Sequence, residues 1–337
     1  MKAIGYRQTG PIDRPDALVD IELDRPDPGG HDVLVQIEAI AVNPVDTKIR
    51  QRVGPEGADW KVLGWDASGR VVSVGAEVSR FKPGDEVFYA GALTRPGTNS
   101  EFHLVDERIV GHKPATLDHA QAAALPLTTL TAWEMLFDRL DVRRPVPGAA
   151  NAVLIIGGAG GVGSMAIQLL KALTDLTVIA TASRSDTQEW VRSLGADHVV
   201  NHRQPLAPQL SALGLGSPAF VFSTTATAQH LADVVELIAP QGRFGLIDDP
   251  DTLDISGFKR KSVSVHWEFM FTRSMFGTAD MDAQGRLLDE LARLVDAGRV
   301  RSTLTQRISP INAENLKQAH TVLESGRACG KIVLEGF

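Results

Sequence analysis

A cluster of glycines lies between an apolar run and a helical pattern near the middle of the chain. The apolar run covers residues 152–156, the glycines fall within 157–163, and the helical pattern spans 164–173. Glycines in a G-x-G-x-x-G motif bring the backbone close to a dinucleotide pyrophosphate, and free N–H groups at the following helix N-terminus stabilise its charge. The order of strand, glycines and helix therefore predicts a dinucleotide site, with a ligand-free turn as the alternative.

Three of these glycines have separate predicted roles. Gly158 is expected to turn the chain off the strand, Gly160 to let backbone N–H groups reach the pyrophosphate, and Gly163 to let the helix pack closely on the sheet. Each role depends on the missing Cβ atom.

The residues that follow the next apolar run indicate which dinucleotide is bound. That run covers 177–182 and is followed by Ser183 and Arg184, where an NAD enzyme would carry Asp or Glu. A guanidinium offers paired donors to phosphate oxygens, and a carboxylate would repel them. We therefore expect NADP(H), with NADPH as the reductant. The alternative is a solvated Arg184 that pairs with Asp186 at the surface.

Length and composition are those of a globular protein with two domains. The chain has 337 residues, of which 43% are hydrophobic and 22% charged. The net charge of −7 argues against a nucleic-acid partner, and no segment is apolar for long enough to span a membrane, so we expect cytoplasmic localisation. The single cysteine, Cys329, excludes intrachain disulfides and a cysteine-based zinc site.

The pattern of short elements changes near residue 125. Before it, alternating apolar runs such as 32–39, 70–74 and 84–89 are broken by Pro and Gly, which predicts a β-rich domain. After it, strands alternate with helices, which predicts a parallel α/β sheet with right-handed connections. The expected strands are 219–222, 243–247 and 262–267, and the expected helices are 188–194, 228–238 and 281–295. The run 331–334 is expected to form a last strand.

Several motifs in this order resemble the medium-chain dehydrogenase/reductase superfamily, in its quinone oxidoreductase (zeta-crystallin-like) branch, often labelled zinc-type alcohol dehydrogenase-like. They are AVNPVDT at 41–47, FKPGDEVF at 81–88, ALPLTTLTAW at 124–133, the glycine cluster, LGAD at 194–197 and GKIVL at 330–334. The resemblance implies an α/β chain with a GroES-like catalytic domain at 1–127 and 273–337. It also implies a Rossmann doubly wound sheet at 128–272, and assembly as a homodimer or tetramer.

The same resemblance shows where the zinc branch carries its metal ligands. A zinc alcohol dehydrogenase would have cysteine where Asn43 stands, and histidine and glutamate where Trp65 and Asp66 stand. Asn is a poor zinc ligand and the indole has no lone pair to give, so we expect no zinc. The four cysteines of the branch's structural zinc site are also missing.

Without a metal, the hydride acceptor must already be electrophilic, as quinones and α,β-unsaturated carbonyls are. The protein would then act through orientation and hydrogen bonding. The resemblance nominates Asn43 as a donor near the nicotinamide. Asp46 is expected either to relay a proton or simply to cap the turn after Pro44.

Aromatic residues in two regions are candidates for a substrate pocket for planar acceptors. They are Trp65 and Tyr89 in the β-rich domain, and Trp267 and Phe269 near the end of the Rossmann domain. If the last strand continues, Trp267, Phe269 and Phe271 share one face, which favours core or dimer interface over substrate wall. The Tyr89 hydroxyl would either donate to a carbonyl or satisfy an internal group.

Further cofactor contacts follow from the resemblance. Lys331 is a candidate for closing over the cofactor, or else a surface lysine before an edge strand. The full set of expected contacts is Thr129, Gly158, Gly160, Gly161, Val162, Gly163, Ser183, Arg184, His202, Thr224, Ile247, Asp248 and Lys331.

Three functions follow from these observations. The favoured one is a zinc-independent, NADPH-dependent reductase of quinones or α,β-unsaturated carbonyls. The others are a zinc-type alcohol dehydrogenase and a non-catalytic, NADPH-binding structural or redox-sensing protein.

Overall fold

The computed structural model describes residues 1–55 and 59–337, which form two compact units. Unit 1 comprises Met1–Leu130 and Phe271–Phe337, and unit 2 comprises Thr131–Met270. The domain boundaries expected from the sequence stay a prediction.

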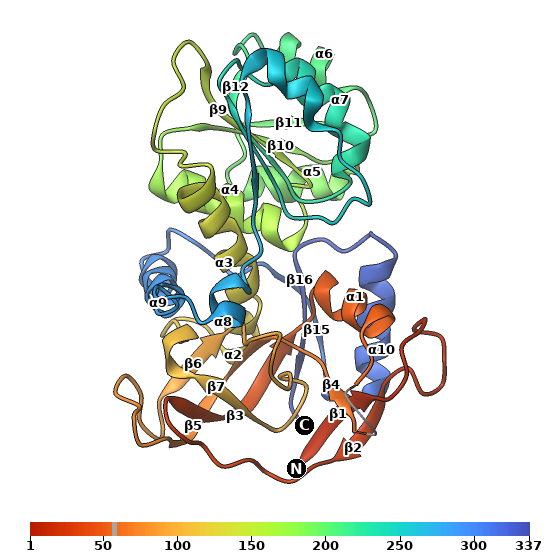
Figure 1. Cartoon of the computed structure of the whole chain (residues 1–337), viewed down its shortest axis with the longest axis vertical. Helices are drawn as coiled ribbons and strands as arrows, with labels where there is room; N and C mark the ends of the chain where they lie inside the picture. Colours follow the sequence, from red (N-terminus) through yellow and green to blue (C-terminus); the bar gives the residue numbers. More distant parts are fainter. Residues whose placement is uncertain (56–58) are drawn as a thin grey trace. The chain divides into compact units, whose positions relative to one another are not determined.

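Unit 2 is built on a six-stranded sheet in which every pair of neighbouring strands is parallel (Figure 1). Its strands are β9 (Ala150–Ile156), β10 (Thr177–Thr181), β11 (His198–Val200), β12 (Pro218–Ser223), β13 (Arg243–Leu246) and β14 (Ser264–Trp267). The spatial order β11-β10-β9-β12-β13-β14 is that of a doubly wound Rossmann sheet. The predicted fold class is confirmed.

Helices connect these strands and bury their apolar faces against the sheet. They are α4 (Gly161–Leu173), α5 (Ser185–Ser193), α6 (Leu206–Ala212) and α7 (Thr227–Leu237), and the unit also contains the π-helix η2 (Glu134–Arg139) and the 3₁₀ helix η3 (Ile255–Lys261). One core cluster of the unit includes Leu154, Val221, Phe244 and Phe258, all fully or almost fully buried. The carboxyl ends of the strands meet at one edge of the sheet, where ligands of such folds bind.

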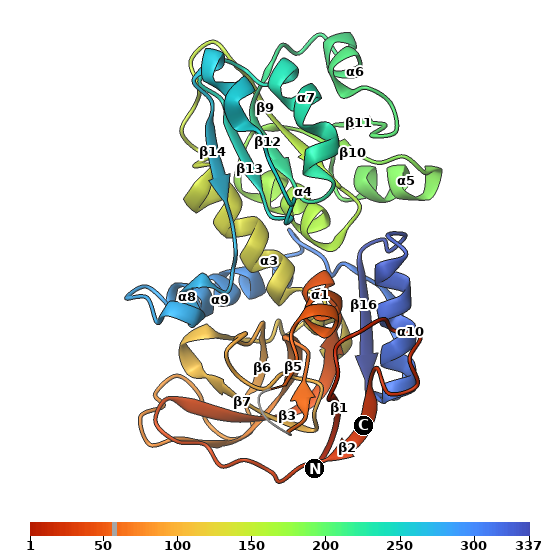
Figure 2. The same cartoon turned by 45° about the vertical axis from the view of Figure 1, so that its right-hand side comes forward.

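The last strand of unit 2 ends at Trp267, the limit expected from the sequence, and the aromatic residues beyond it lie outside the sheet. β14 ends at Trp267 and forms the edge of the sheet beside β13 (Figure 2). Trp267 and Phe269 are 55% and 49% exposed, whereas Phe271 is buried. The expectation that Trp267, Phe269 and Phe271 share one strand face is therefore wrong, because the chain leaves the sheet before Phe269.

Unit 1 contains a seven-stranded sheet and a three-stranded sheet. The larger has the order β15-β16-β3-β5-β6-β8, with β7 also paired to β3, and the smaller has the order β2-β1-β4. The strands are β1 (Lys2–Tyr6), β2 (Val19–Glu22), β3 (Asp32–Ala41), β4 (Lys61–Val62), β5 (Asp66–Val74), β6 (Glu86–Tyr89), β7 (Phe102–Asp106), β8 (Val110–His112), β15 (Leu304–Ile308) and β16 (Lys331–Glu335).

Strand β16 brings the end of the chain into the middle of the larger sheet. It pairs with β15 on one side and antiparallel to β3 on the other, with Val333 opposite Ala41. Lys331 therefore begins an interior strand and is buried. The alternative of a surface lysine before an edge strand is wrong.

Short helices complete unit 1. They are η1 (Glu107–Ile109), α1 (Pro44–Arg52), α2 (His119–Ala123), α3 (Pro126–Trp133), α8 (Thr272–Phe276), α9 (Ala283–Asp296) and α10 (Ala313–Glu324). The division between the units falls within α3. Helix α9 buries the leucines of its apolar face. A Cβ atom on Gly111 of β8 would lie 2.4 Å from the Cβ of Leu288, so only glycine fits at position 111.

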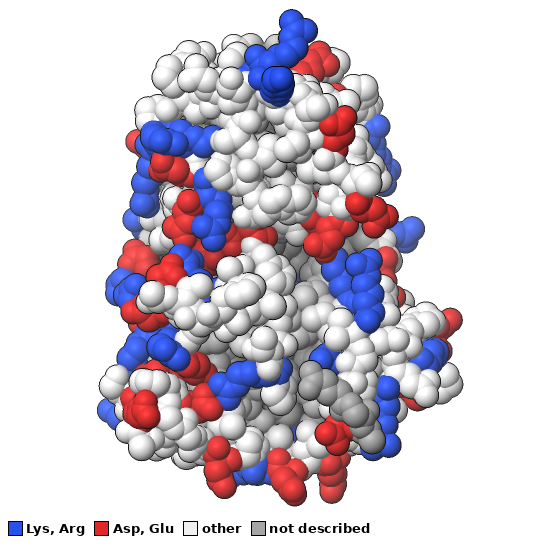
Figure 3. Space-filling model, viewed as in Figure 1, with Lys and Arg blue, Asp and Glu red and all other residues white. Residues whose placement is uncertain are grey.

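The surface carries charges of both signs. On the face drawn in Figure 3, Lys and Arg groups are interspersed with Asp and Glu groups. Within residues 1–55 and 59–337, no helix has the length and hydrophobicity needed to cross a membrane.

Candidate functional site

The glycine turn of unit 2 connects β9 to α4. Gly157 has φ +84°, a left-handed conformation that strongly favours glycine, so the chain turns there and not at Gly158 as predicted. Gly158 is required for a different reason, because a Cβ there would lie 2.9 Å from the Cβ of Ala180. The Gly157 and Gly158 N–H groups donate to Oγ1 and O of Thr181, at 3.0 and 3.1 Å.

The first turn of α4 packs tightly against the glycine turn at Gly163 but not at Gly160. A Cβ on Gly163 would lie 2.3 Å from the Gly157 carbonyl oxygen, which accounts for its predicted role in close helix packing. A Cβ on Gly160 would meet only that oxygen, at 3.6 Å. The side of Gly160 is therefore open to a ligand. The loop has the shape a pyrophosphate needs, with free N–H groups at the start of a 13-residue helix.

Several predicted cofactor residues gather at the carboxyl ends of neighbouring strands. His202 follows β11, and its Nδ1 lies 3.2 Å from Oγ1 of Thr181 at the end of β10. Thr224 follows β12 and donates through Oγ1 to the Ile156 carbonyl at the end of β9, at 2.8 Å. The structure thus brings His202 and Thr224 to the two sides of the glycine turn.

Ser183 and Arg184 leave β10 at the same edge. Arg184 precedes α5 and its Nε lies 3.3 Å from Oδ1 of Asp186, so the surface pairing considered from the sequence is present. The Arg184 side chain is 36% exposed and that of Asp186 is 68% exposed, so water weakens the pair. Burial, together with the positive charges of nearby residues that include Arg184, lowers the pKa of His202. Basic groups therefore gather where a 2′-phosphate is expected.

Asp248 has a structural partner. It follows β13 and Ile247, and its Oδ2 accepts the Thr227 N–H at 2.9 Å while Oδ1 bonds the Thr227 hydroxyl. The carboxylate thereby stabilises the N-terminus of α7, where Ala226 has φ +52°. The predicted cofactor contact of Asp248 stays a prediction.

In unit 1, Asn43, Asp66 and Lys331 form a buried network. The Lys331 ammonium donates to Oδ2 of Asp66 at 2.9 Å, to Oδ1 of Asn43 at 2.5 Å and to the Val42 carbonyl at 2.9 Å. Asn43 Nδ2 donates to Oδ2 of Asp66 at 2.8 Å and to the Ala41 carbonyl at 3.3 Å. All three side chains are at most 3% exposed.

The amide of Asn43 is therefore fully engaged inside the protein. Its oxygen accepts from Lys331 and its nitrogen donates to Asp66 and to the backbone. The predicted donation from Asn43 to the acceptor would require one of these bonds to be given up.

Asp46 lies beside this network with one oxygen bonded and one not. Oδ2 accepts the Asn43 backbone N–H at 2.7 Å, closing the first turn of α1, which is the capping role considered from the sequence. Oδ1 is buried without a hydrogen-bond partner. Burial raises the pKa of Asp46 to about 7, because the desolvated carboxylate outweighs the effects of the Asn43 N–H and the Lys331 charge. Asp46 is therefore about half protonated at pH 7 and mostly protonated below it.

Thr129 lies in α3, which is joined to the same network. The Leu127 N–H at the start of α3 donates to Oδ1 of Asp66 at 2.7 Å. The Thr129 hydroxyl is buried and has no hydrogen-bond partner. An open buried hydroxyl is compatible with its predicted contact to the nicotinamide or its ribose.

Trp65 and Tyr89 are both buried in unit 1. The indole N–H of Trp65 donates to the Ala92 carbonyl at 3.3 Å, and its ring meets Phe271 edge-on at 6.0 Å. The Tyr89 hydroxyl lies 3.0 Å from Nδ1 of His103, whose Nε2 lies 2.9 Å from the Pro96 carbonyl. Because Nε2–H must donate to that carbonyl, Nδ1 accepts from Tyr89. The hydroxyl thus satisfies an internal group, the alternative considered from the sequence.

Unit 2 holds a buried acid that sequence reasoning missed. Glu268, between Trp267 and Phe269, is buried and its Oε2 accepts from Nε of Arg139 at 2.8 Å. Burial and the neighbouring Glu134 raise the pKa of Glu268 to about 8. An acidic residue inside the aromatic run was the only signal for it.

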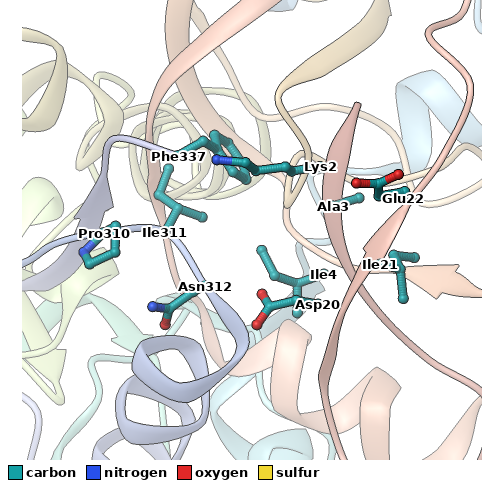
Figure 4. Close-up of a pocket in the computed structure, with 10 residues that line it drawn as sticks. All are labelled: Lys2, Ala3, Ile4, Asp20, Ile21, Glu22, Pro310, Ile311, Asn312 and Phe337. Atoms are coloured by element: carbon teal, nitrogen blue, oxygen red, sulfur yellow. The ribbon is translucent and has the colours of Figure 1, made fainter.

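A hollow of about 410 Å³ in unit 1 contains none of the predicted site residues (Figure 4). It is lined by strands β1 and β2, by Pro310, Ile311 and Asn312, and by Phe337. Its acidic group Asp20 is already used, since Oδ1 accepts the Ala313 N–H at 2.9 Å.

A Rossmann sheet with a glycine turn, joined to a β-rich unit built from both chain ends, defines a nicotinamide-dependent dehydrogenase or reductase. The chain matches the alcohol dehydrogenase GroES-like domain over residues 29–116 and the zinc-binding dehydrogenase family over 194–334. It belongs to the medium-chain dehydrogenase/reductase superfamily, as the sequence motifs indicated.

Two curated relatives illustrate the range of names in this family. A zinc-type alcohol dehydrogenase-like protein of Staphylococcus epidermidis is 38% identical over 99% of both chains. The human mitochondrial NAD(P)H oxidoreductase RTN4IP1 is 32% identical over 90% of this chain and 81% of its own.

Solved structures confirm the fold. A Rhizobium etli structure, provisionally described as a zinc-dependent alcohol dehydrogenase protein, has 65% identity and a TM-score of 0.99, covering 100% of this chain and 98% of the other. Escherichia coli quinone oxidoreductase with NADPH has 23% identity and a TM-score of 0.81, and the match covers 99% of this chain and 100% of the other. At that identity it supports the fold alone.

The residues at the positions of the zinc ligands do not fit zinc. Trp65 donates its only polar hydrogen, and the oxygen of Asn43 is bonded to an ammonium ion. The Lys331 charge lies against Asp66, where it would repel a second cation. In the described ranges 1–55 and 59–337, no cluster of three His, Cys, Asp or Glu side chains is suited to a metal.

Proposed function

We propose that the chain is a zinc-independent, NADPH-dependent reductase that transfers hydride to a quinone or an α,β-unsaturated carbonyl. The observation that carries this proposal is the closed Asn43, Asp66 and Lys331 network at the positions of the zinc ligands. The charges of the Lys331 ammonium and the Asp66 carboxylate cancel. The N–H donors of Lys331 and Asn43 are bonded to oxygen atoms inside the protein. Such a centre offers no strong Lewis acid to an unactivated ketone or alcohol, so an acceptor that is already electrophilic fits best.

The residues of the glycine turn fit a dinucleotide. We assign the pyrophosphate to the N–H groups at the start of α4, from Gly161 to Gly163, because the side of Gly160 is open and the helix dipole favours an anion, whereas the Gly160 N–H donates to the Gly157 carbonyl at 3.2 Å. Ser183, Arg184 and His202 would hold the 2′-phosphate. When bound, NADPH supplies the hydride.

The second requirement of the reaction is a proton. Reduction of a quinone or enone takes up one hydride and one proton, and Asp46 is a buried acid whose raised pKa, about 7, leaves about half of it protonated at pH 7. We assign Asp46 as the proton source and Asn43 as the residue that holds it, because the Asn43 N–H binds Oδ2 and leaves Oδ1 open. Protonation at Oδ1 would leave that bond intact.

An acceptor screen tests the proposal. NADPH oxidation would be followed with 1,4-benzoquinone, an enone, a simple aldehyde and a simple ketone, with NADH in parallel. We expect turnover with the quinone or enone and a lower KM for NADPH than for NADH. Tight NADPH binding without oxidation by any acceptor would instead support the non-catalytic binding function. Sedimentation of the same sample would test the expected homodimer or tetramer.

The names of the relatives favour a zinc-type alcohol dehydrogenase as the second candidate. Metal analysis of the purified protein distinguishes the two. We expect less than stoichiometric zinc and full activity after treatment with a chelator. Stoichiometric zinc that is lost together with alcohol oxidation would overturn zinc independence.

A further inference from the structure

Lys331 lies in a cage of three oxygen atoms. Its ammonium has three N–H donors, and the acceptors are the Val42 carbonyl, Oδ1 of Asn43 and Oδ2 of Asp66, at 2.5 to 2.9 Å. The side chain is 3% exposed. No donor is left over for a cofactor phosphate, so the contact with the cofactor predicted from the sequence would require the cage to open.

The cage joins four segments of unit 1 that are far apart in the chain. Lys331 begins β16, Asn43 precedes α1 and Asp66 begins β5. The second oxygen of Asp66 accepts the Leu127 N–H at the start of α3, 61 residues further on. One ammonium ion therefore fixes both the first turn of α1, which carries Asp46, and helix α3, which carries Thr129. Oδ1 of Asp46 and the Thr129 hydroxyl are both buried without a hydrogen-bond partner.

A buried ion pair is an expensive way to hold segments together. Removing one member leaves the other charged and desolvated, whereas an apolar replacement of the whole pair is often neutral for stability. Retention of the charges is consistent with a role in fixing the position of the attached groups. Lysine also does here what a metal ion would do, because it is a compact cation with several oxygen partners.

We propose that Lys331 is a positioning residue, an internal cation that holds Asn43 and Asp66 in place of a metal ion and thereby orders the first turn of α1, which carries Asp46. Its catalytic effect rests on the reductase function proposed above. The existence of the cage does not depend on that function, because the cage is defined by the three oxygen atoms that surround the ammonium. Without the lysine side chain, this site should bind a small primary ammonium ion.

The first test is Lys331→Ala with n-propylammonium, ethylammonium or tetramethylammonium chloride at equal ionic strength. We expect a lower Tm and a kcat for quinone reduction lowered roughly tenfold to hundredfold, with the KM for NADPH little changed. Propylammonium should restore part of both Tm and kcat, and tetramethylammonium, which has no N–H, neither. A raised KM for NADPH with an unchanged kcat would indicate that Lys331 binds the cofactor, and it would overturn the proposal.

Lys113→Ala is the matched control. Lys113 is also a buried lysine of unit 1, and its ammonium lies 3.2 Å from Glu86, outside the cage. We expect it to lower Tm and leave kcat unchanged. An equal loss of kcat in both variants would show that Lys331 acts through stability alone.

The double variant Asp66→Asn with Lys331→Met separates positioning from stability. It removes both charges while keeping an oxygen for the Leu127 N–H, so Tm should exceed that of Lys331→Met alone. We expect kcat to stay at least about tenfold below that of the unmodified protein. Recovery of kcat together with Tm would overturn the positioning role. If the unmodified protein reduces no acceptor, the proposed function fails, and rescue of Tm by propylammonium still decides whether the cage exists.

Discussion

Replacing Asp46 by Asn should change how the stability of the protein depends on pH. Burial raises the pKa of Asp46 from 3.8 in the unfolded chain to about 7 in the folded protein. Between these pH values the folded protein keeps a proton that the unfolded chain has lost. Raising the pH through this window therefore destabilises the folded protein, and the loss is complete above pH 7.

The expected size follows from the same shift. Each pKa unit corresponds to about 1.4 kcal/mol, so the unmodified protein should lose about 3 kcal/mol of unfolding free energy from this group between pH 5 and pH 8. Asp46→Asn cannot ionise, and its oxygen can still accept the Asn43 N–H. The variant should gain about 3 kcal/mol relative to the unmodified protein over that range.

Urea unfolding of both proteins at half-unit intervals from pH 5 to pH 8.5 measures this difference. Asp296→Asn is a suitable control, because hydrogen bonds from Thr116 and Ala115 lower the pKa of that exposed carboxyl, so its effect on stability should be constant from pH 5 to pH 8.5. A pH-independent difference between Asp46→Asn and the unmodified protein would refute the assignment of a buried neutral acid. In kinetics, kcat should fall above pH 7 in the unmodified protein and be low and flat in the variant.

Three further predictions concern the cofactor site and a buried tyrosine. Arg184→Glu should raise the KM for NADPH roughly tenfold or more and leave the KM for NADH nearly unchanged, by loss of a charge-assisted bond to phosphate; equal effects on both would contradict NADP specificity. Gly163→Ala should lower Tm, since its Cβ would lie 2.3 Å from the Gly157 oxygen, whereas Gly160→Ala should keep Tm and weaken NADPH binding in a fluorescence titration; similar melting of the two would argue against this packing. Tyr89→Phe should cost about 1 kcal/mol in urea unfolding with kcat unchanged, because its hydroxyl bonds an internal histidine; a large loss of kcat would restore the role at the substrate.

Local patterns predicted most of the fold of unit 2. The apolar runs and the glycine cluster are each contained in a short window, and the corresponding elements β9, α4 and β10 form within two or three residues of the expected limits. The prediction failed at residue scale where packing decides. The left-handed turn falls on Gly157, and Phe269 and Phe271 lie beyond the strand that ends at Trp267, so aromatic alternation does not place them on one strand face.

The candidate site was predicted in part. Asn43, Asp46 and Lys331 were nominated from the motifs that contain them, but their relation was not. The sequence identified Asp66 only as a lost metal ligand and gave no role to Glu268. The sequence shows that a residue carries a charge, but it does not show whether that residue is buried. The apolar run behind Lys331 was a signal that it opens a buried strand.

By itself, the sequence determined the class of this protein, because strand, helix and glycine signals are local and their order is preserved in the folded chain. It also determined that the residues at the zinc positions are poor ligands. Only the tertiary structure decided which groups are open for chemistry. The partners of Lys331 lie 265 and 288 residues away, and their meeting engages the amide of Asn43 and leaves one oxygen of Asp46 free. Burial and pairing of this kind depend on long-range contacts, which no window of the sequence contains.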